Sequence, residues 1–111
     1  MTRVKERQAQ LASIRKLPIS AKLLAVLEGA ASDAGVDEVV VYSGGQEKAP
    51  SKNRTGSARH DNGNAADIWL SIKGRQLNFD TASDRPTVAA FVTSCVKRGA
   101  TGIGAAADYM G

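Results

Sequence analysis

Residues Glu38–Tyr42 (EVVVY) and Ala66–Ile72 (ADIWLSI) decide the fold that this sequence predicts. The first stretch is short and rich in β-branched residues, which is typical of a buried strand. The second alternates apolar and polar residues, as a strand does when one of its faces packs on a core and the other does not. We therefore expect both stretches to be strands of one small sheet.

One helix is expected before these two strands in the sequence and another after them, because apolar residues recur in both places at helical spacing. The first runs near residues 20–34, with Ser20 as its N-cap and Gly35 as its stop. The second spans residues 84–99. Cys95 lies on the apolar face of this second helix, so we expect a thiol in the core.

The remaining stretches complete a simple order of elements. Lys73-Gly74 is a turn signal, and residues 76–79 (QLNF) predict the return strand of a hairpin. A last short strand is expected within residues 100–104. The order of helix, strand, hairpin, helix and strand predicts an α+β domain with a small, mainly antiparallel sheet and two packed helices.

Length and composition limit the class of protein. A chain of 111 residues is sufficient for one domain with a modest core, and its 42% apolar and 23% charged residues are ordinary for a globular chain. No apolar run approaches the ~20 residues that span a bilayer, so no membrane partner is expected, and no signal peptide is visible. The single cysteine excludes an internal disulfide.

The positive charge is concentrated at the N-terminus. Residues 1–16 hold the whole net charge of +4, because acidic and basic residues balance in residues 17–111. We therefore divide the chain into a basic N-terminal arm, residues 1–16, and a domain, residues 17–111. Such an arm is either a solvated leader or a contact for nucleic acid, the anionic cell wall or an acidic protein partner. No aromatic residue lies among its charges, so nucleic acid is the least favoured of these partners.

The single histidine lies in a long polar stretch, residues 43–64, that predicts a loop. His60 precedes Asp67 of the second predicted strand, and Gly63 between them permits a turn of the chain. A neutral imidazole and a carboxylate are both good zinc ligands. From the residues alone, a hydrogen bond between the two side chains at the surface is the more common arrangement.

A family resemblance favours a role for His60 and Asp67 as zinc ligands. Residues 56–67 (GSARHDNGNAAD) resemble the Ser…His-x-x-Gly-x-Ala-x-Asp signature of the zinc D-alanyl-D-alanine peptidase superfamily, with matches at His60, Gly63, Ala65 and Asp67. That superfamily includes bacterial carboxypeptidases, van-type dipeptidases and phage endolysins, and it shares its fold with the hedgehog signalling domain. Softer similarity in the flanking segments extends the resemblance over residues 17–111.

The resemblance implies a hedgehog-like fold and a zinc ion held by His60 and Asp67. Zinc in this family polarises a peptide carbonyl and activates a bound water, so the implied reaction is hydrolysis of peptide bonds in peptidoglycan. Gln46 occupies the place of an arginine that assists the family's reaction. Asp61 is implied as a support for His60, and Asp108 is the candidate for a late catalytic group.

The same resemblance suggests where peptidoglycan peptide stems bind. Ser43 shapes the turn that follows the first strand. Arg54 and Arg59 either hold a carboxylate of a peptide stem or are solvated loop charges. Trp69 has the same parity as Asp67 along its strand, so it faces the same side. It either stacks on a substrate or covers the edge of the core.

One departure from the family pattern leaves the function open. The family takes its third zinc ligand from a late histidine, and this sequence contains only His60. Three explanations remain: a strand beyond Gly111 is missing, the protein has a structural or wall-binding role, or a partner chain, Asp108 or Cys95 completes the site. We expect a zinc-dependent peptidoglycan peptidase-like domain of phage origin, acting at the cell wall from the host cytoplasm or the virion. The alternative is a non-catalytic virion or cell-wall-binding protein that is anchored by its basic arm, with phage structural proteins as possible partners of the arm.

Overall fold

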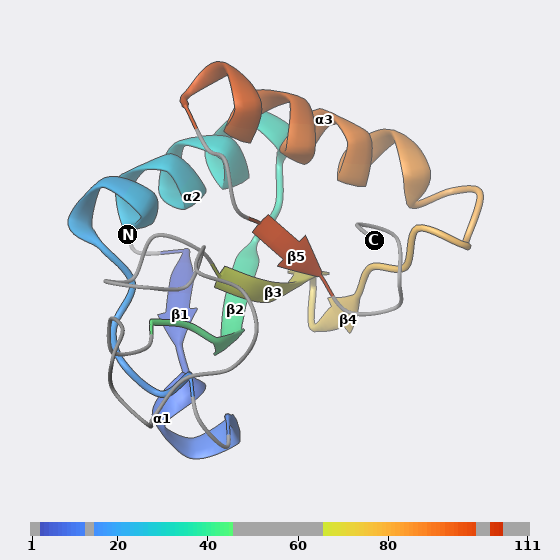
Figure 1. Ribbon diagram of the computed structural model, residues 1–111. Helices are drawn as coiled ribbons and strands as arrows, with labels where there is room; N and C mark the ends of the chain where they lie inside the picture. The colour runs from blue at the N-terminus through green and yellow to red at the C-terminus, as the bar shows by residue number, and fades with distance from the viewer. Residues whose placement is uncertain (1–2, 13–14, 46–65, 100–102, 106–111) are drawn as a thin grey trace.

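The fold is a mixed β-sheet with two long helices on one of its faces (Figure 1). A computed structural model describes residues 3–12, 15–45, 66–99 and 103–105. In chain order the elements are β1 (Val4–Glu6), α1 (Gln8–Leu11), α2 (Ala21–Ala34), β2 (Glu38–Ser43), β3 (Ala66–Ile72), β4 (Arg75–Gln76), α3 (Arg85–Lys97) and β5 (Ile103–Ala105). Among the described residues, no helix is long and apolar enough to cross a membrane.

The sheet has the order β1-β2-β3-β4, with β5 also paired to β3. The pairs β2–β3 and β3–β4 are antiparallel, whereas β1–β2 and β3–β5 are parallel. The predicted α+β class is therefore confirmed, but the prediction of a mainly antiparallel sheet is wrong. Two helices cause the difference: α2 carries the chain from β1 back to β2, and α3 lies between the β3–β4 hairpin and β5. Parallel strands require crossovers of this kind.

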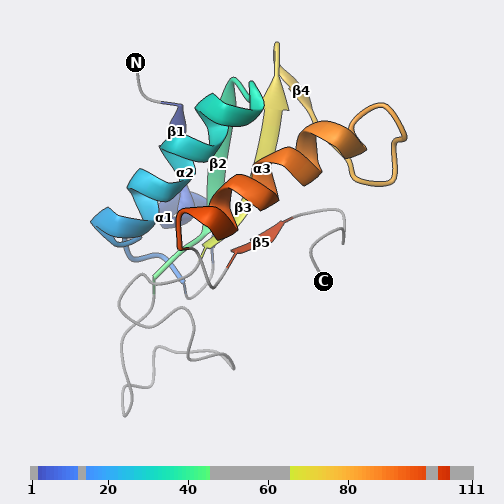
Figure 2. The same ribbon diagram turned by 90° about the horizontal axis from the view of Figure 1, so that it is seen from above.

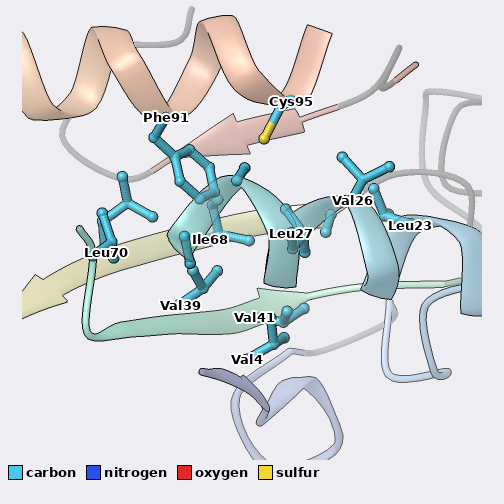
Figure 3. Packing of buried hydrophobic residues seen from close by; sticks show 14 of the residues in the cluster. Val4, Leu23, Val26, Leu27, Val39, Val41, Ile68, Leu70, Phe91 and Cys95 are labelled. Carbon is cyan, nitrogen blue, oxygen red and sulfur yellow. The ribbon is translucent and has the colours of Figure 1, made fainter. Parts of the chain in front are cut away.

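Helices α2 and α3 cover one face of the sheet, and the core lies between (Figures 2 and 3). Alternate residues of β3 point into this core, and Ala66, Ile68 and Leu70 are each 0% exposed. Phe91 of α3 is also fully buried there. The half-buried strand expected at residues 66–72 is thus confirmed.

Both ends of α2 follow the prediction. The side chain of Ser20 accepts a hydrogen bond from the backbone N–H of Leu23 at 3.1 Å, which satisfies a donor that the first helical turn leaves free. Gly35 ends the helix in the left-handed conformation with φ 72°, which side chains other than glycine rarely adopt.

The thiol of Cys95 lies in the core, as predicted, and is 1% exposed. Desolvation raises its pKa to about 12, since burial disfavours the charged thiolate. The thiolate is the form that attacks substrates and binds metals. Cys95 therefore packs as an apolar residue, and burial argues against the idea that it completes a metal site.

The predicted return strand of the hairpin is shorter than expected. It covers only Arg75–Gln76, because Leu77 turns into the core and the backbone N–H of Asn78 donates to the carboxylate of Asp84 at 3.0 Å. Arg75 donates to both oxygens of that carboxylate, at 2.9 and 2.7 Å. These bonds fix the hairpin to the start of α3. Asp84 is only 3% exposed.

The N-terminal segment, residues 3–12, belongs to the domain. Val4 in β1 is 5% exposed and joins the core. The carboxylate of Glu28 in α2 accepts hydrogen bonds from the backbone N–H groups of Arg3 and Val4 at 2.8–3.1 Å. Packing therefore begins well before residue 17, where the sequence analysis places the start of the domain.

Basic side chains of this segment are engaged within the molecule. Arg3 donates to the backbone carbonyl of Val36 at 2.7 Å, and Lys5 forms an ion pair with Glu38 at 2.9 Å. In both contacts a positively charged side chain near the N-terminus binds a group at the start of β2 or just before it.

Replacing the N-cap tests how far local hydrogen bonding stabilises α2. Ser20→Ala is expected to lower the free energy of unfolding by about 0.5–2 kcal/mol, since the backbone N–H of Leu23 loses its acceptor. Urea unfolding followed by circular dichroism measures this. Ser32→Ala, an exposed position inside the same helix, is the matched control and is expected to leave stability nearly unchanged.

Asp84 gives the domain a defined acid sensitivity. Hydrogen bonds from Arg75 and from the backbone of Asn78 lower its pKa from 3.8 to about 2. A depressed pKa in the folded state contributes stability above the unfolded value, and this stability is lost as the pH falls from about 3.8 through about 2. The urea midpoint of Asp84→Asn should therefore lie below that of the wild type at neutral pH and approach it in that window. Asp80→Asn, which changes an exposed carboxylate in the nearby turn, is the matched control, and its urea midpoint at neutral pH should stay close to that of the wild type.

Candidate functional site

The candidate site lies where β2 ends and β3 begins, on the sheet face opposite α2 and α3, which we call the outer face. Ser43, Asp67 and Trp69 are the predicted site residues that the structure describes. The other predicted site residues lie outside the described ranges: Gln46, Arg54, Arg59, His60, Asp61 and Asp108.

Strand pairing brings Ser43 and Asp67 together. Their Cα positions are partners in the β2–β3 ladder, after a register shift between Val41 and Ser43. On its other side Asp67 is paired with Gly104 of β5. Three segments that are far apart in the sequence thus meet at Asp67, at one end of the sheet.

Sequence analysis did not identify the described partner of Asp67, which is Arg15. The Nη1 atom of Arg15 lies 3.2 Å from Oδ2 of Asp67, and the two side chains are 24% and 25% exposed. Arg15 comes from the predicted basic N-terminal arm, residues 1–16. No local pattern marks a pair that is so distant in sequence, and only the folded chain brings the two charges together.

The backbone around Arg15 is held against the end of β2. Gly44 donates its N–H to the carbonyl of Arg15 at 2.8 Å. Leu17 and Gly45 exchange two backbone hydrogen bonds, at 3.0 and 2.8 Å. The position of the Arg15 backbone is therefore fixed by the chain that follows Ser43.

A buried glutamine explains why a glycine is needed at this junction. Gln8 is 2% exposed, and its Nε2 atom donates to Glu6 and to the carbonyl of Leu17 at 3.0 and 3.1 Å. A Cβ atom on Gly44 would lie 2.8 Å from the carbonyl oxygen of Leu17 and 2.9 Å from Nε2 of Gln8. Any larger residue at position 44 would push this segment, and Arg15 with it, away from the sheet.

Two aromatic side chains stack on the same face. The rings of Tyr42 and Trp69 have centroids 5.0 Å apart and planes inclined by 21°. Trp69 is half-buried and alternates with the core residues of β3, so it shares the face of Asp67 as predicted. The stack joins β2 to β3 beside the carboxylate. Binding of a substrate by Trp69 stays a prediction.

The described residues provide one carboxylate for a metal and no complete centre. Among them, no group of three or more His, Cys, Asp or Glu side chains is arranged to hold a metal ion. Asp67 is the predicted ligand among them, and its carboxylate is paired with the guanidinium of Arg15. The proposed second ligand, His60, lies outside the described ranges.

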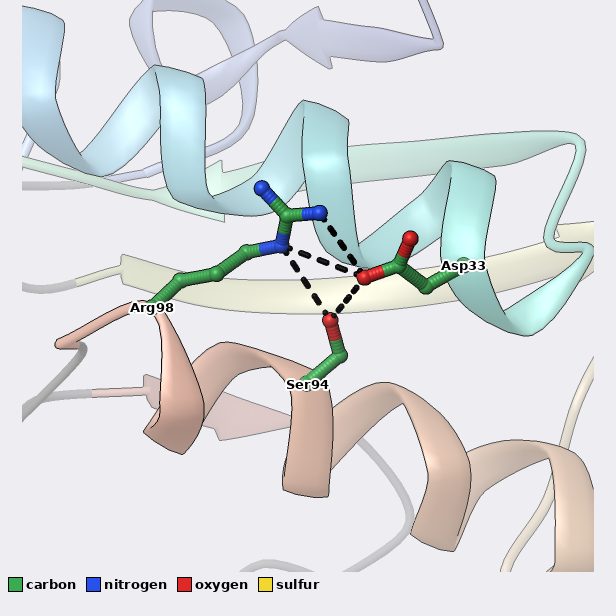
Figure 4. Close-up of polar contacts among 3 residues, drawn as sticks. All are labelled: Asp33, Ser94 and Arg98. Carbon is green, nitrogen blue, oxygen red and sulfur yellow. Dashed lines mark hydrogen bonds and ion pairs between the residues drawn. The ribbon is translucent and has the colours of Figure 1, made fainter.

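A second polar cluster joins the two long helices (Figure 4). Asp33 of α2 accepts hydrogen bonds from Ser94 at 2.6 Å and from Arg98 at 2.9 Å, and these bonds lower its pKa. Arg98 lies directly over Gly29, where a Cβ atom would come within 2.4 Å of the guanidinium. An open groove of about 510 Å³ borders this cluster. Since Asp33 and Arg98 form an ion pair with each other, the cluster stabilises the packing of α2 against α3.

Comparison with known proteins identifies no relative of this chain. No protein-family model matches the chain, and no curated protein or solved structure is significantly similar to it. The resemblance to zinc D-alanyl-D-alanine peptidases therefore rests on the motif in residues 56–67 and its flanks.

The aromatic stack offers a direct optical probe of the outer face. Tyr42→Ala is expected to lower the free energy of unfolding by at least about 0.5–1.5 kcal/mol, the contribution of an aromatic pair beyond its buried area. Because Trp69 is the only tryptophan, its emission should also shift to the red as one ring face becomes hydrated. Tyr42→Phe retains the ring and should keep the emission of the wild type. An unchanged spectrum in Tyr42→Ala would contradict the stacked arrangement.

Proposed function

We propose that this chain is a peptidoglycan peptidase-like domain with a hedgehog-like fold, and that its site surrounds Asp67 on the outer face. The observation that supports this most is the pairing of Ser43 with Asp67 in the β2–β3 ladder. These residues belong to the two separate segments that carry the family resemblance. A common site requires the two segments to be adjacent, and sheet register makes them so.

In this proposal His60 and Asp67 are zinc ligands, and peptidoglycan peptide stems are the substrate. Asp67 is suited to the role by its half-buried position, because a carboxylate that is partly desolvated binds a cation more strongly than a fully solvated one. Gln46, Asp61 and Asp108 retain their proposed catalytic roles, and Arg54 and Arg59 their proposed contacts with peptide carboxylates. Phage endolysins are the functional analogy on which this proposal draws.

A second candidate function is favoured by a different observation. Asp67 already has a counter-ion in Arg15, so the carboxylate has a structural use that needs no metal. This favours a non-catalytic virion or cell-wall-binding protein with a peptidase-derived fold. The outer face would then bind peptide stems or a phage structural protein without cleaving them.

Zinc content separates the two candidates. Purified protein, loaded with zinc and then dialysed, should retain about one zinc per chain by elemental analysis if the site is a zinc centre. His60→Ala and Asp67→Asn should each lose that zinc, because each removes a proposed ligand. Asp80→Asn removes a carboxylate of the turn before α3 and is the matched control, which should keep the zinc.

Activity on the polymer completes the test. The zinc-loaded protein should release new amino groups from purified peptidoglycan, and both ligand variants should release none. Loss of zinc from the wild type on dialysis, together with binding to peptidoglycan in a sedimentation assay, would reject the peptidase and favour the wall-binding candidate. Absence of both zinc and wall binding would reject the peptidase and the wall-binding role, and would leave only the virion protein among the candidates.

A further inference from the structure

Gln8 is the most deeply buried polar residue among those that the structure describes, at 2% exposed. It is also the only buried residue of α1. Burial of an amide is unfavourable unless the amide makes hydrogen bonds, so its place in the core calls for a reason. Building on the proposed function, which places the site around Asp67, we infer that Gln8 is a positioning residue of that site. Its amide holds the segment that places Arg15 beside Asp67.

The amide nitrogen of Gln8 joins two parts of the N-terminal segment. Its Nε2 atom donates to Oε1 of Glu6 at 3.0 Å and to the carbonyl of Leu17 at 3.1 Å. The same oxygen of Glu6 accepts a hydrogen bond from the backbone N–H of Ile19 at 3.0 Å. The chain that follows Arg15 is therefore fastened to the end of β1 through one amide and one carboxylate.

The neighbours of this amide determine its orientation. A half-turn of the amide would place its oxygen against the Glu6 carboxylate and the Leu17 carbonyl, which are both acceptors. In the observed orientation, Oε1 of Gln8 has no hydrogen-bond partner among the described residues. An unpaired buried acceptor costs free energy, and the two bonds made by Nε2 offset this cost. Gln8 is consequently used as a donor.

The same side chain sets how closely the segment approaches the end of β2. A Cβ atom on Gly44 would lie 2.9 Å from Nε2 of Gln8, so the amide packs directly against the backbone there. The N–H of Gly44 donates to the carbonyl of Arg15 at 2.8 Å. The backbone of Arg15 is thus held by Gly44 at its own carbonyl and by Gln8 two residues later. Nη1 of Arg15 then lies 3.2 Å from Oδ2 of Asp67.

A fixed backbone matters for this ion pair because the pair is partly exposed. Long side chains lose conformational entropy when they form such a pair, and this loss cancels much of the electrostatic gain. A backbone that already directs the arginine toward its partner reduces the loss. The interaction of Arg15 with Asp67 should therefore weaken when the Gln8 amide is removed.

Gln8→Met is the variant that removes the amide with the least other change. Methionine has a similar length, and only the two bonds from Nε2 are lost, since Oε1 has no partner among the described residues. Both acceptors keep another donor. Glu6 still accepts from the N–H of Ile19, and the carbonyl of Leu17 still accepts from the N–H of Gly45 at 2.8 Å.

A double-mutant cycle measures how strongly the ion pair interacts. The unfolding equilibrium constant is determined in urea for the wild type, Arg15→Gln, Asp67→Asn and the double variant. All measurements use the full chain with EDTA at low ionic strength, where screening is weak. In the wild-type background, the two substitutions should depart from additivity by roughly twofold to fivefold in this constant. In the Gln8→Met background the factor should fall to about one.

Val88→Ala is the matched control for general loss of stability. Val88 is 1% exposed and belongs to α3, on the other side of the sheet from the ion pair. Its truncation leaves a cavity and should lower the stability of the domain. The coupling between Arg15 and Asp67 should nevertheless stay as in the wild type. A residue that only stabilises the fold would leave this coupling unchanged, whereas a positioning residue removes it.

Three results would overturn the inference. Coupling that persists in Gln8→Met shows that the amide contributes stability alone. Coupling that is lost equally in Val88→Ala assigns the loss to general loosening of the domain. Absence of coupling in the wild type leaves no interaction for Gln8 to position. If Gln8→Met does not fold, Gly44→Ala takes its place, since the added Cβ would displace the amide. Coupling that persists in Gly44→Ala overturns the inference in the same way.

The cycle needs neither zinc nor peptidoglycan, so its failure is distinguishable from failure of the proposed function. Persistent coupling in Gln8→Met, together with zinc-dependent hydrolysis by the wild type, rejects only the role of Gln8. Coupling that is lost in Gln8→Met alone, in a protein that retains no zinc, rejects the peptidase and keeps Gln8 as the residue that positions Arg15.

Discussion

The antiparallel pairing of β2 with β3 is the interaction on which the rest of the structure depends. Its register places Val39 opposite Leu70 and Val41 opposite Ile68, so that four apolar side chains form one surface beneath α2 and α3. A shift by one residue would turn this surface away from the helices. The same register pairs Ser43 with Asp67, whose side chain lies on the outer face. Core formation and assembly of the candidate site are therefore consequences of one alignment.

β1 and the residues that follow it connect this strand pair to the candidate site on the outer face. β1 adds a parallel strand to β2, and Glu28 binds the backbone N–H groups on the other side of β1. After β1, the backbone of Arg15 binds Gly44, and the Arg15 side chain lies beside Asp67. A glycine at position 44 is required for this close approach. The most basic part of the sequence is in this way built into the fold, and one of its charges becomes part of the candidate site.

Two polar clusters with the same chemistry serve different purposes in this small domain. Asp84 is nearly fully buried and receives three hydrogen bonds from Arg75 and Asn78, so its role is to fasten the hairpin to α3. Asp67 is partly exposed at the end of a strand. A carboxylate that is fully enclosed by donors has no room for a ligand, whereas a partly exposed one can exchange its counter-ion. This difference makes Asp67 the candidate for binding.

The sequence by itself determined the local elements, because their signals are local. Helical spacing, the Ser20 cap and the Gly35 stop define α2, and alternation along residues 66–72 defines β3. The burial of Cys95 followed from its place on an apolar helix face. Tertiary structure alone decided the parallel placement of β1 and β5, the short β4 and the pairing of Arg15 with Asp67. These features join segments that are distant along the chain, and which segments meet depends on how the whole core packs rather than on any short pattern of residues.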